Sequence, residues 1–170
     1  MNLACVDVDY RARGAVAGCV LFTAWADVTP ARELVATAAA DEVAPYVPGQ
    51  LYRRELPLLE RVLARVGHPL DVVLVDGHVW LDAAGAPGLG AHLWEALGRR
   101  SHVIGVAKTA YVGAPAIAVR RGHSASPLHV TAAGMSADEA ARHVAAMDGP
   151  HRLPTLLTRV DRLCREAPLP

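Results

Sequence analysis

The chain begins with two apolar runs that are joined by a very short connection. The runs Leu3–Asp9 and Ala15–Ala24 are typical of β-strands, and the residues between them include the turn candidate Arg11–Gly14. This connection can form a hairpin but has no room for a helix, so the two strands should be antiparallel. A flavodoxin-like or other doubly wound fold would need a helix there, which argues against that alternative. A weaker run, Leu34–Ala39, predicts a third strand of the same meander.

Helices and strands alternate in the middle of the chain. Apolar residues recur at helical spacing within Pro57–Val66, and this helix is predicted to begin near Pro48–Gly49. The run Asp71–Asp76 is rich in valine, which is typical of a strand buried on both faces. A helix is predicted over Gly90–Leu97 and another buried strand over His102–Ala107. Strands separated by helices predict a parallel portion of the sheet.

The last third of the chain is predicted to add a hairpin and two helices. Ala116–Val119 and Pro127–Thr131 should form the hairpin. Ser136 begins the sequence Ser-Ala-Asp-Glu, which matches a helix capping box, and Pro154–Arg165 has an amphipathic helical pattern. We therefore expect a ribonuclease H-like α/β fold with a mixed five-stranded sheet and helices on both faces. Residues 1–170 should form one domain.

The composition favours a globular protein with a substantial core. The chain is 52% hydrophobic and 20% charged, and no apolar run approaches the roughly 18 residues that a membrane span needs. The amino terminus has no signal-peptide pattern, so none is expected. The three cysteines, Cys5, Cys19 and Cys164, have no metal-binding spacing. We expect them to be reduced and the protein to be cytoplasmic.

The charge balance restricts how the chain could bind nucleic acid. Its 17 basic residues equal its 17 acidic residues, whereas proteins that neutralise many phosphates usually have a basic excess. Any nucleic-acid surface should therefore be a local patch. The candidates are Lys108, which is the only lysine, and some of Arg53, Arg54 and Arg152.

Three acidic residues occupy positions that suggest chemistry. Asp7 lies within the first apolar run, Asp76 ends the buried strand, and Glu55 follows two arginines at the start of the helical segment. If the first and fourth strands are neighbours, Asp7 and Asp76 can project side by side, with Glu55 near them. Such carboxylates repel one another unless a cation lies among them, and Mg²⁺ prefers oxygen ligands of this kind. The alternative is that Asp76 forms a turn and Asp7 is exposed at an edge.

Several short motifs occur in an order that resembles the endonuclease V family over nearly the whole chain. They are Val6-Asp7-Val8-Asp9-Tyr10, Pro45-Tyr46-Val47-Pro48-Gly49, Arg54-Glu55-Leu56-Pro57, Val75-Asp76-Gly77-His78, Gly105-Val106-Ala107-Lys108-Thr109, and the C-terminal Arg152-Leu153-Pro154-Thr155 to Asp161-Arg162-Leu163. Each motif alone is weak, and their order carries the resemblance.

The resemblance implies a metal-dependent endonuclease that hydrolyses a phosphodiester near deaminated bases such as hypoxanthine, in DNA or RNA. It implies Asp7, Glu55, Asp76 and Lys108 as catalytic residues, with Asp7 and Asp76 binding Mg²⁺, for which Mn²⁺ could substitute. It also implies nucleic-acid contacts for His78 and for a wedge formed by Tyr46, Pro48 and Gly49. A flipped base needs an apolar, stackable group in its place, which suits a tyrosine. Tyr46 could instead pack on the start of the helix.

The chain also departs from the family pattern. The resemblance implies a histidine after the last strand, but residues 130–136 contain none. Trp80-Leu81-Asp82 stands where a second family histidine is expected, and the N-terminal extension of longer members is absent. Asp9 and Asp82 are acids at positions that are usually neutral or histidine, and they could remodel the metal site. For Asp9 we instead expect a side chain that points to the opposite face of the strand or lies at the strand end in solvent. His123 and His129 are possible replacements, although both positions are typical of surface histidines.

These departures leave a second function open. The chain could be a catalytically impaired relative that binds nucleic acid or a protein partner without cutting. The three carboxylates favour the enzyme, because clustered acids without a cation are costly. The preference for DNA or RNA, the number of metal ions, the cleavage position and the oligomeric state do not follow from the sequence.

Overall fold

The first three strands form the antiparallel meander that the short first connection predicts. The computed structural model, which describes residues 1–169, places β1 at Leu3–Arg11, β2 at Gly14–Phe22 and β3 at Arg32–Ala39. β1 and β2 are antiparallel with Arg11 opposite Gly14, so residues 12 and 13 make the hairpin turn. β3 continues the meander on the other side of β2. The argument against a doubly wound fold is thereby confirmed.

The middle of the chain forms the expected parallel portion. Its elements are α1 (Tyr52–Leu63), β4 (Val72–Asp76), α2 (Leu89–Ala96) and β5 (His102–Ala107), and a single 3₁₀ turn, Ala40–Glu42, precedes them. β4 lies between β1 and β5 and is parallel to both. Helix α1 begins later than predicted. The Pro48–Gly49 pair instead forms a turn closed by a 3.0 Å bond from the Gln50 amide to the Val47 carbonyl, with Gly49 at φ +76°.

The C-terminal hairpin joins the same sheet rather than standing apart from it. β6 (Ile117–Val119) pairs with β7 (Leu128–Ala133), and β7 pairs antiparallel with β5. The sheet therefore has seven strands in the order β3-β2-β1-β4-β5-β7-β6. The expected mixed sheet is present, but the count of five strands is wrong because it left out this hairpin.

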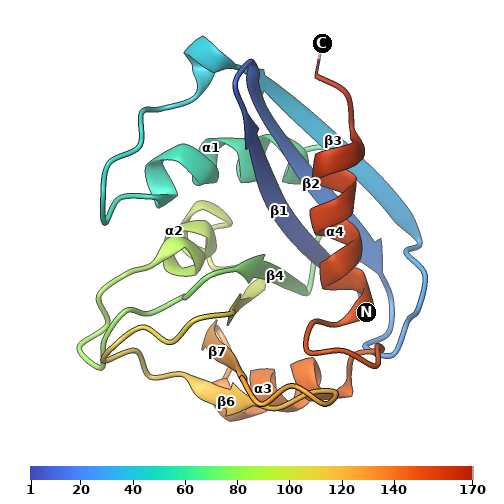
Figure 1. Ribbon diagram of the computed structural model, residues 1–170, viewed down its shortest axis with the longest axis vertical. Helices are drawn as coiled ribbons and strands as arrows, with labels where there is room; N and C mark the ends of the chain where they lie inside the picture. The colour runs from blue at the N-terminus through green and yellow to red at the C-terminus, as the bar shows by residue number, and fades with distance from the viewer. Residues whose placement is uncertain (170) are drawn as a thin grey trace.

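Two helices cover each face of the sheet (Figure 1). One apolar core packs α1 and α2 against one face. The other packs α3 (Ala137–Ala146) and α4 (Thr155–Glu166) against the opposite face, and α4 contacts β1 and β2. The Ser136 hydroxyl accepts a 3.2 Å hydrogen bond from the Glu139 amide and caps α3, as the sequence predicts. Within residues 1–169, none of the helices has both the length and the apolar character that crossing a bilayer requires.

Candidate active site

The carboxyl ends of β1 and β4 bring two predicted acids to the same face of the sheet. The strands are parallel and Val6 lies beside Val75, so the next residues, Asp7 and Asp76, are neighbours. Side chains alternate along a strand. Because Cys5 and Leu74 pack in the core beneath α3 and α4, the aspartates two residues further along point to that face. The predicted juxtaposition is therefore present.

A small cavity of about 60 Å³ lies between these acids, the end of β5 and helix α4. Its polar lining includes Asp7, Asp76, Lys108 and Asp161. The Lys108 ammonium is 3.2 Å from Oδ2 of Asp76, and about half of each side chain is exposed. The lysine is thus bound to a carboxylate at the edge of the sheet, in reach of solvent.

Asp161 is a fourth acid at this site, and it belongs to the C-terminal motif, from which no role for it was predicted. It lies on α4 four residues after Leu157, which is buried against the sheet, so both project toward the same side. Its charge helps to raise the pKa of Asp7. An acid bordering the apolar stripe of an amphipathic helix is the signal that could have identified it.

The two candidate histidines do not join this group. His129 alternates with Leu128 and Val130, whose side chains pack beneath α3 and α4, so His129 points to the face opposite Asp7. His123 is exposed in the turn between β6 and β7. The group that joins the three predicted acids and Lys108 at this site is therefore the Asp161 carboxylate, not a histidine.

Burial and mutual repulsion disturb the acids of the cluster. Burial raises the pKa of Glu55 to about 8, and the charges of Asp7 and Asp76 add to the rise. Burial likewise raises the pKa of Asp7 to about 6; a hydrogen bond from the Val8 amide opposes this rise, and Asp76 and Asp161 add to it. Glu55 approaches from α1, on the other face of the sheet. Acidic groups therefore reach this end of the strands from both faces of the sheet, and the charges of the two aspartates make ionisation of Glu55 less favourable.

The turn after β4 is held by close contacts with β5 and β7. Gly77 has φ +124°, and a Cβ atom on Gly105 would lie 2.5 Å from the Gly77 carbonyl oxygen, so glycine is required at both positions. The buried Thr131 hydroxyl accepts a 2.8 Å bond from the Val79 amide. His78 Nε2 lies 3.1 Å from the Thr109 carbonyl oxygen. Asp76 is therefore presented by a fixed turn.

Exposed apolar side chains are concentrated on two loops. Tyr46 is 62% exposed and has Val47 and Leu51 as exposed neighbours, while Tyr111 is 52% and Val112 97% exposed. Because Tyr46 is so exposed, it is not a packing residue of the helix start. Tyr111 follows Lys108 in the chain and shares a hollow of about 340 Å³ with Asp76 and His78.

Several predicted basic and acidic groups are already bonded within the protein. Arg152 donates to main-chain carbonyl oxygens, and the Arg54 guanidinium lies over the ring of Tyr10, 4.2 Å from its centre. Asp9 pairs with Arg11 at 2.8 Å, and Asp82 accepts a 2.9 Å bond from the Ala86 amide in a loop. Because side chains alternate along β1, Asp9 projects to the same face as Asp7, so the expectation that it points to the opposite face is wrong; its carboxylate is bonded to Arg11 near the end of the strand.

The donor set at this edge suits a hard divalent cation. Carboxylate oxygens are the ligands that Mg²⁺ prefers, and a cation would relieve the repulsion that raises the pKa values of Asp7 and Glu55. Within residues 1–169, no three His, Cys, Asp or Glu side chains are already arranged to hold a metal ion. The oxygen ligands thus have the right chemistry for such an ion, but their present arrangement is not a formed metal site, and Asp76 is bonded to Lys108 instead.

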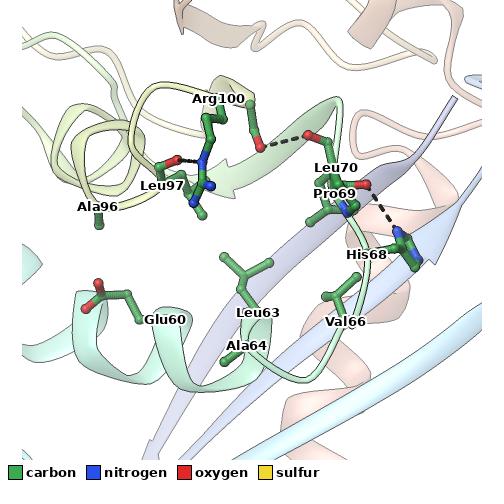
Figure 2. Close-up of a pocket in the computed structure, with 11 residues that line it drawn as sticks. Glu60, Leu63, Ala64, Val66, His68, Pro69, Leu70, Ala96, Leu97 and Arg100 are labelled. Atoms are coloured by element: carbon green, nitrogen blue, oxygen red, sulfur yellow. Dashed lines mark hydrogen bonds between the residues drawn. The ribbon is translucent and has the colours of Figure 1, made fainter.

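A larger hollow, of about 610 Å³, lies at the opposite end of the sheet between α1 and α2 (Figure 2). Its lining is mostly aliphatic. Among its polar side chains, Ser101 Oγ donates to the Leu70 carbonyl oxygen at 2.7 Å and Arg100 Nε donates to the Leu97 carbonyl oxygen at 3.3 Å, and the Glu60 carboxylate also lines it. This hollow has the larger volume, but it gathers no cluster of perturbed ionisable groups.

Comparisons with known proteins agree with the fold and with the motifs. Residues 1–147 match the sequence model of the endonuclease V family. Endonuclease V of Rhodospirillum centenum is 44% identical over 87 residues, a stretch that covers 50% of this chain and only 35% of that protein.

Solved structures of the family share the architecture. Endonuclease V of Streptomyces avermitilis is 26% identical with a TM-score of 0.80, covering 97% of this chain and 80% of that one. Ciona intestinalis endonuclease V, in complex with a 24mer DNA containing an inosine followed by a ribo-adenosine, is 18% identical with a TM-score of 0.84. That match covers 97% of this chain and 84% of that chain, and it bears on the fold alone. The expected ribonuclease H-like α/β class is confirmed, and the family match, which extends over most of the sequence, shows that this chain belongs to the endonuclease V family.

Proposed function

We propose that this chain is a metal-dependent endonuclease that hydrolyses a phosphodiester near deaminated bases, such as hypoxanthine, in DNA or RNA. The observation that carries the proposal is the cluster of four carboxylates, Asp7, Glu55, Asp76 and Asp161, beside Lys108 at one edge of the sheet. Family membership supports nuclease chemistry. The cluster supports the metal dependence, because so many acids would otherwise repel one another.

The metal ligands in this proposal are Asp7 and Asp76, with Mg²⁺ as the ion and Mn²⁺ as a substitute. A bound ion would supply positive charge against the phosphodiester and a more acidic water. Asp161 adds negative charge from the α4 side, which strengthens the attraction of the site for a cation. Glu55, with its pKa raised to about 8, holds a proton on its carboxyl group at neutral pH until a cation arrives.

Lys108 has the role of a phosphate contact. Its ammonium is bonded to Asp76 at 3.2 Å and is half exposed, so an incoming phosphate oxygen could compete for it. When a cation takes over the charge of Asp76, the lysine becomes available to neutralise a non-bridging oxygen. Lys108 thus neutralises Asp76 when no cation is bound and would neutralise a phosphate oxygen when one is.

Recognition of the damaged base is assigned to the exposed loop at Pro45–Gly49. Its turn suits the residues present, because Pro48 has a fixed φ and Gly49 adopts the positive φ of the next position, and Tyr46, just before the turn, is 62% exposed. An exposed aromatic side chain can fill the space that a flipped base leaves. The inosine-containing DNA bound to the Ciona relative supports this substrate class. His78, beside Asp76, is proposed as a further nucleic-acid contact.

The decisive experiment is a cleavage assay on DNA and RNA oligonucleotides that contain one inosine, with matched oligonucleotides containing adenosine or guanosine. We expect cutting at the inosine strands with Mg²⁺ or Mn²⁺ and none with EDTA. Binding without cutting under every metal condition would favour the alternative, a catalytically impaired relative. Equal cutting of the inosine and control strands would contradict the proposed substrate.

A further inference from the structure

One arginine ties the end of β5 to the segment that leads into α4. The terminal nitrogen Nη2 of Arg152 donates to the carbonyl oxygen of Lys108 and, at 2.7 Å, to the carbonyl oxygen of Pro127. Lys108 comes directly after β5, and Pro127 comes directly before β7. Three segments that are distant in the sequence therefore meet at a single guanidinium group.

The segment that carries Arg152 is itself held by a second arginine. Arg121 is buried and donates to the carbonyl oxygens of Met147, Gly149 and His151, the last at 3.2 Å. The backbone of this segment also passes so close to Gly122 that a Cβ there would lie 2.5 Å from the Pro150 carbonyl oxygen. Because the segment is fixed in this way, Arg152 has a firm base from which to hold Lys108.

The position of Lys108 depends strongly on such an anchor. The pairing of β5 with β7 ends at Ala107, so the main chain of Lys108 lies beyond the strand ladder. Its side chain is long and half exposed, and its ammonium has one bond in the structure, to Asp76. On the other side of the anchor, Leu153 lines the same cavity as Asp76 and Asp161. A shift of Arg152 would disturb both the lysine and the approach of α4.

We propose that Arg152 is a positioning residue, which places the Lys108 ammonium beside Asp76 by holding the Lys108 main chain. This role differs from the phosphate contact that the sequence suggested, because Nη2 already donates hydrogen bonds to two carbonyl oxygens. The catalytic consequence rests on the proposed nuclease function, but the positioning itself does not. It can therefore be tested without any cleavage.

The single lysine of the chain makes a direct test possible. Reductive ¹³C-methylation labels Lys108 and the amino terminus and retains the positive charge, so a spectrum should contain two signals. The Lys108 signal is the one that is absent from Lys108→Ala, which assigns the other signal to the terminal amine. Asp76→Asn marks the Lys108 signal when the ion pair is lost. Arg152→Gln should move that signal toward the Asp76→Asn position. Arg142→Gln, which removes the same charge from an exposed site on α3, should leave it unchanged.

Cleavage then tests the consequence. Arg152→Gln should reduce cutting of inosine strands by roughly tenfold to a hundredfold, since small misplacements of a catalytic group have effects of this size. Lys108→Ala and the double variant should be equally slow, because Arg152 acts through the lysine. Arg152→Lys should retain most activity, since one ammonium can reach both carbonyl oxygens.

Two results would overturn the inference. One is a Lys108 signal in folded Arg152→Gln that coincides with the wild-type signal. The other is a double variant slower than Lys108→Ala by the full Arg152→Gln factor, which would mean that Arg152 contacts the substrate independently. If Arg152→Gln unfolds at the assay temperature, the spectra and the cleavage cycle are repeated at a lower temperature at which it is folded, and the same two results would overturn the inference. Failure of the wild type to cleave would reject the nuclease function, while the spectra would still decide the role of Arg152.

Discussion

The two ends of strands β4 and β5 differ in how their polar groups are satisfied. The carboxyl end encloses only about 60 Å³, yet Asp7, Asp76 and Asp161 meet there and Glu55 approaches from the other face. The amino end has a hollow of about 610 Å³ with a mostly aliphatic lining, in which Ser101 and Arg100 bond carbonyl oxygens and Glu60 is the one acid among the lining residues (Figure 2). The small end has the disturbed pKa values.

The candidate site is therefore marked by its cluster of acids and their raised pKa values, and not by the volume of its cavity. Bringing carboxylates together costs free energy, and such a cluster persists only if a ligand or a reaction benefits from it. An aliphatic hollow between two helices carries no such cost. Substitutions at the two ends should therefore have very different consequences for cleavage.

The largest effect is expected for Asp76→Asn. Asparagine keeps the shape of the side chain but removes the charge that would hold the cation and that Lys108 now binds. We expect cleavage of inosine strands to fall by roughly a thousandfold or more, while binding stays equal or improves because less negative charge repels the phosphates. Glu60→Gln, in the amino-end hollow, is the matched control and should cut at the wild-type rate. Equal losses in the two variants would remove the distinction between the ends.

A smaller loss is expected for Asp161→Asn. Asp161 lines the cavity and acts on Asp7 through its charge, but it is not one of the two proposed metal ligands. Cleavage should fall about 10- to 100-fold, and a higher Mg²⁺ concentration should be needed for half-maximal activity. The measurement is a Mg²⁺ titration of the cleavage rate. A loss as complete as that of Asp76→Asn would make Asp161 a ligand in its own right.

Tyr46→Ala should change selectivity rather than metal use. The exposed ring is proposed to replace the flipped base, and stacking of this kind contributes enough to alter rates by about tenfold. The ratio of cutting at inosine to cutting at adenosine should fall by that factor, with an unchanged Mg²⁺ titration. The opposite pattern, an unchanged ratio and weaker Mg²⁺ dependence, would reject the wedge.

The smallest effect concerns stability and its dependence on pH. In the folded protein the pKa of Glu55 is raised to about 8 from its ordinary value of 4.5, so the folded state holds a proton that the unfolded chain releases. Between these pH values the folded state binds more protons, and the free energy of unfolding contributed by Glu55 decreases as pH rises.

Glu55→Gln removes this contribution. In thermal melts with EDTA, the variant should melt only a few degrees higher than the wild type at pH 5 and roughly 10 °C higher at pH 8, since a domain of this size shifts by about 2–4 °C per kcal/mol. Titrating groups that do not interact with Glu55 remain in both proteins and cancel in the difference. If the difference between the two melting temperatures stayed the same from pH 5 to pH 8, the pKa of Glu55 would not be raised in the folded protein, and the carboxyl end would not be under electrostatic strain.

Some of this architecture follows from the sequence by local rules. The short connection at Arg11–Gly14 leaves only an antiparallel hairpin, and Asp71–Asp76 could only be a buried strand. Ser136 caps its helix through the backbone amide three residues later. These features depend on neighbours within a few residues, so the pattern alone is sufficient to predict them.

The site was predictable in part. Asp7 and Asp76 could be selected because they lie within and at the end of apolar runs, and Glu55 because it follows two arginines at the start of the helical segment. The parallel pairing of β1 with β4 then places the two aspartates together. The role of Asp161 could not be predicted, because its distance from Asp7 depends on how α4 crosses β1. The two carbonyl partners of Arg152 lie 44 and 25 residues away in the sequence.

The order of strands and helices, the antiparallel start and the candidate acids could be predicted from the chain alone, because each depends on residue type and spacing. Three features required the folded structure: the last hairpin extends the sheet to seven strands, α4 adds a fourth carboxylate, and Arg152 donates to the carbonyl oxygen of Lys108. The physical reason is that charges and hydrogen bonds act over a few ångströms of space, whatever the number of residues between the groups.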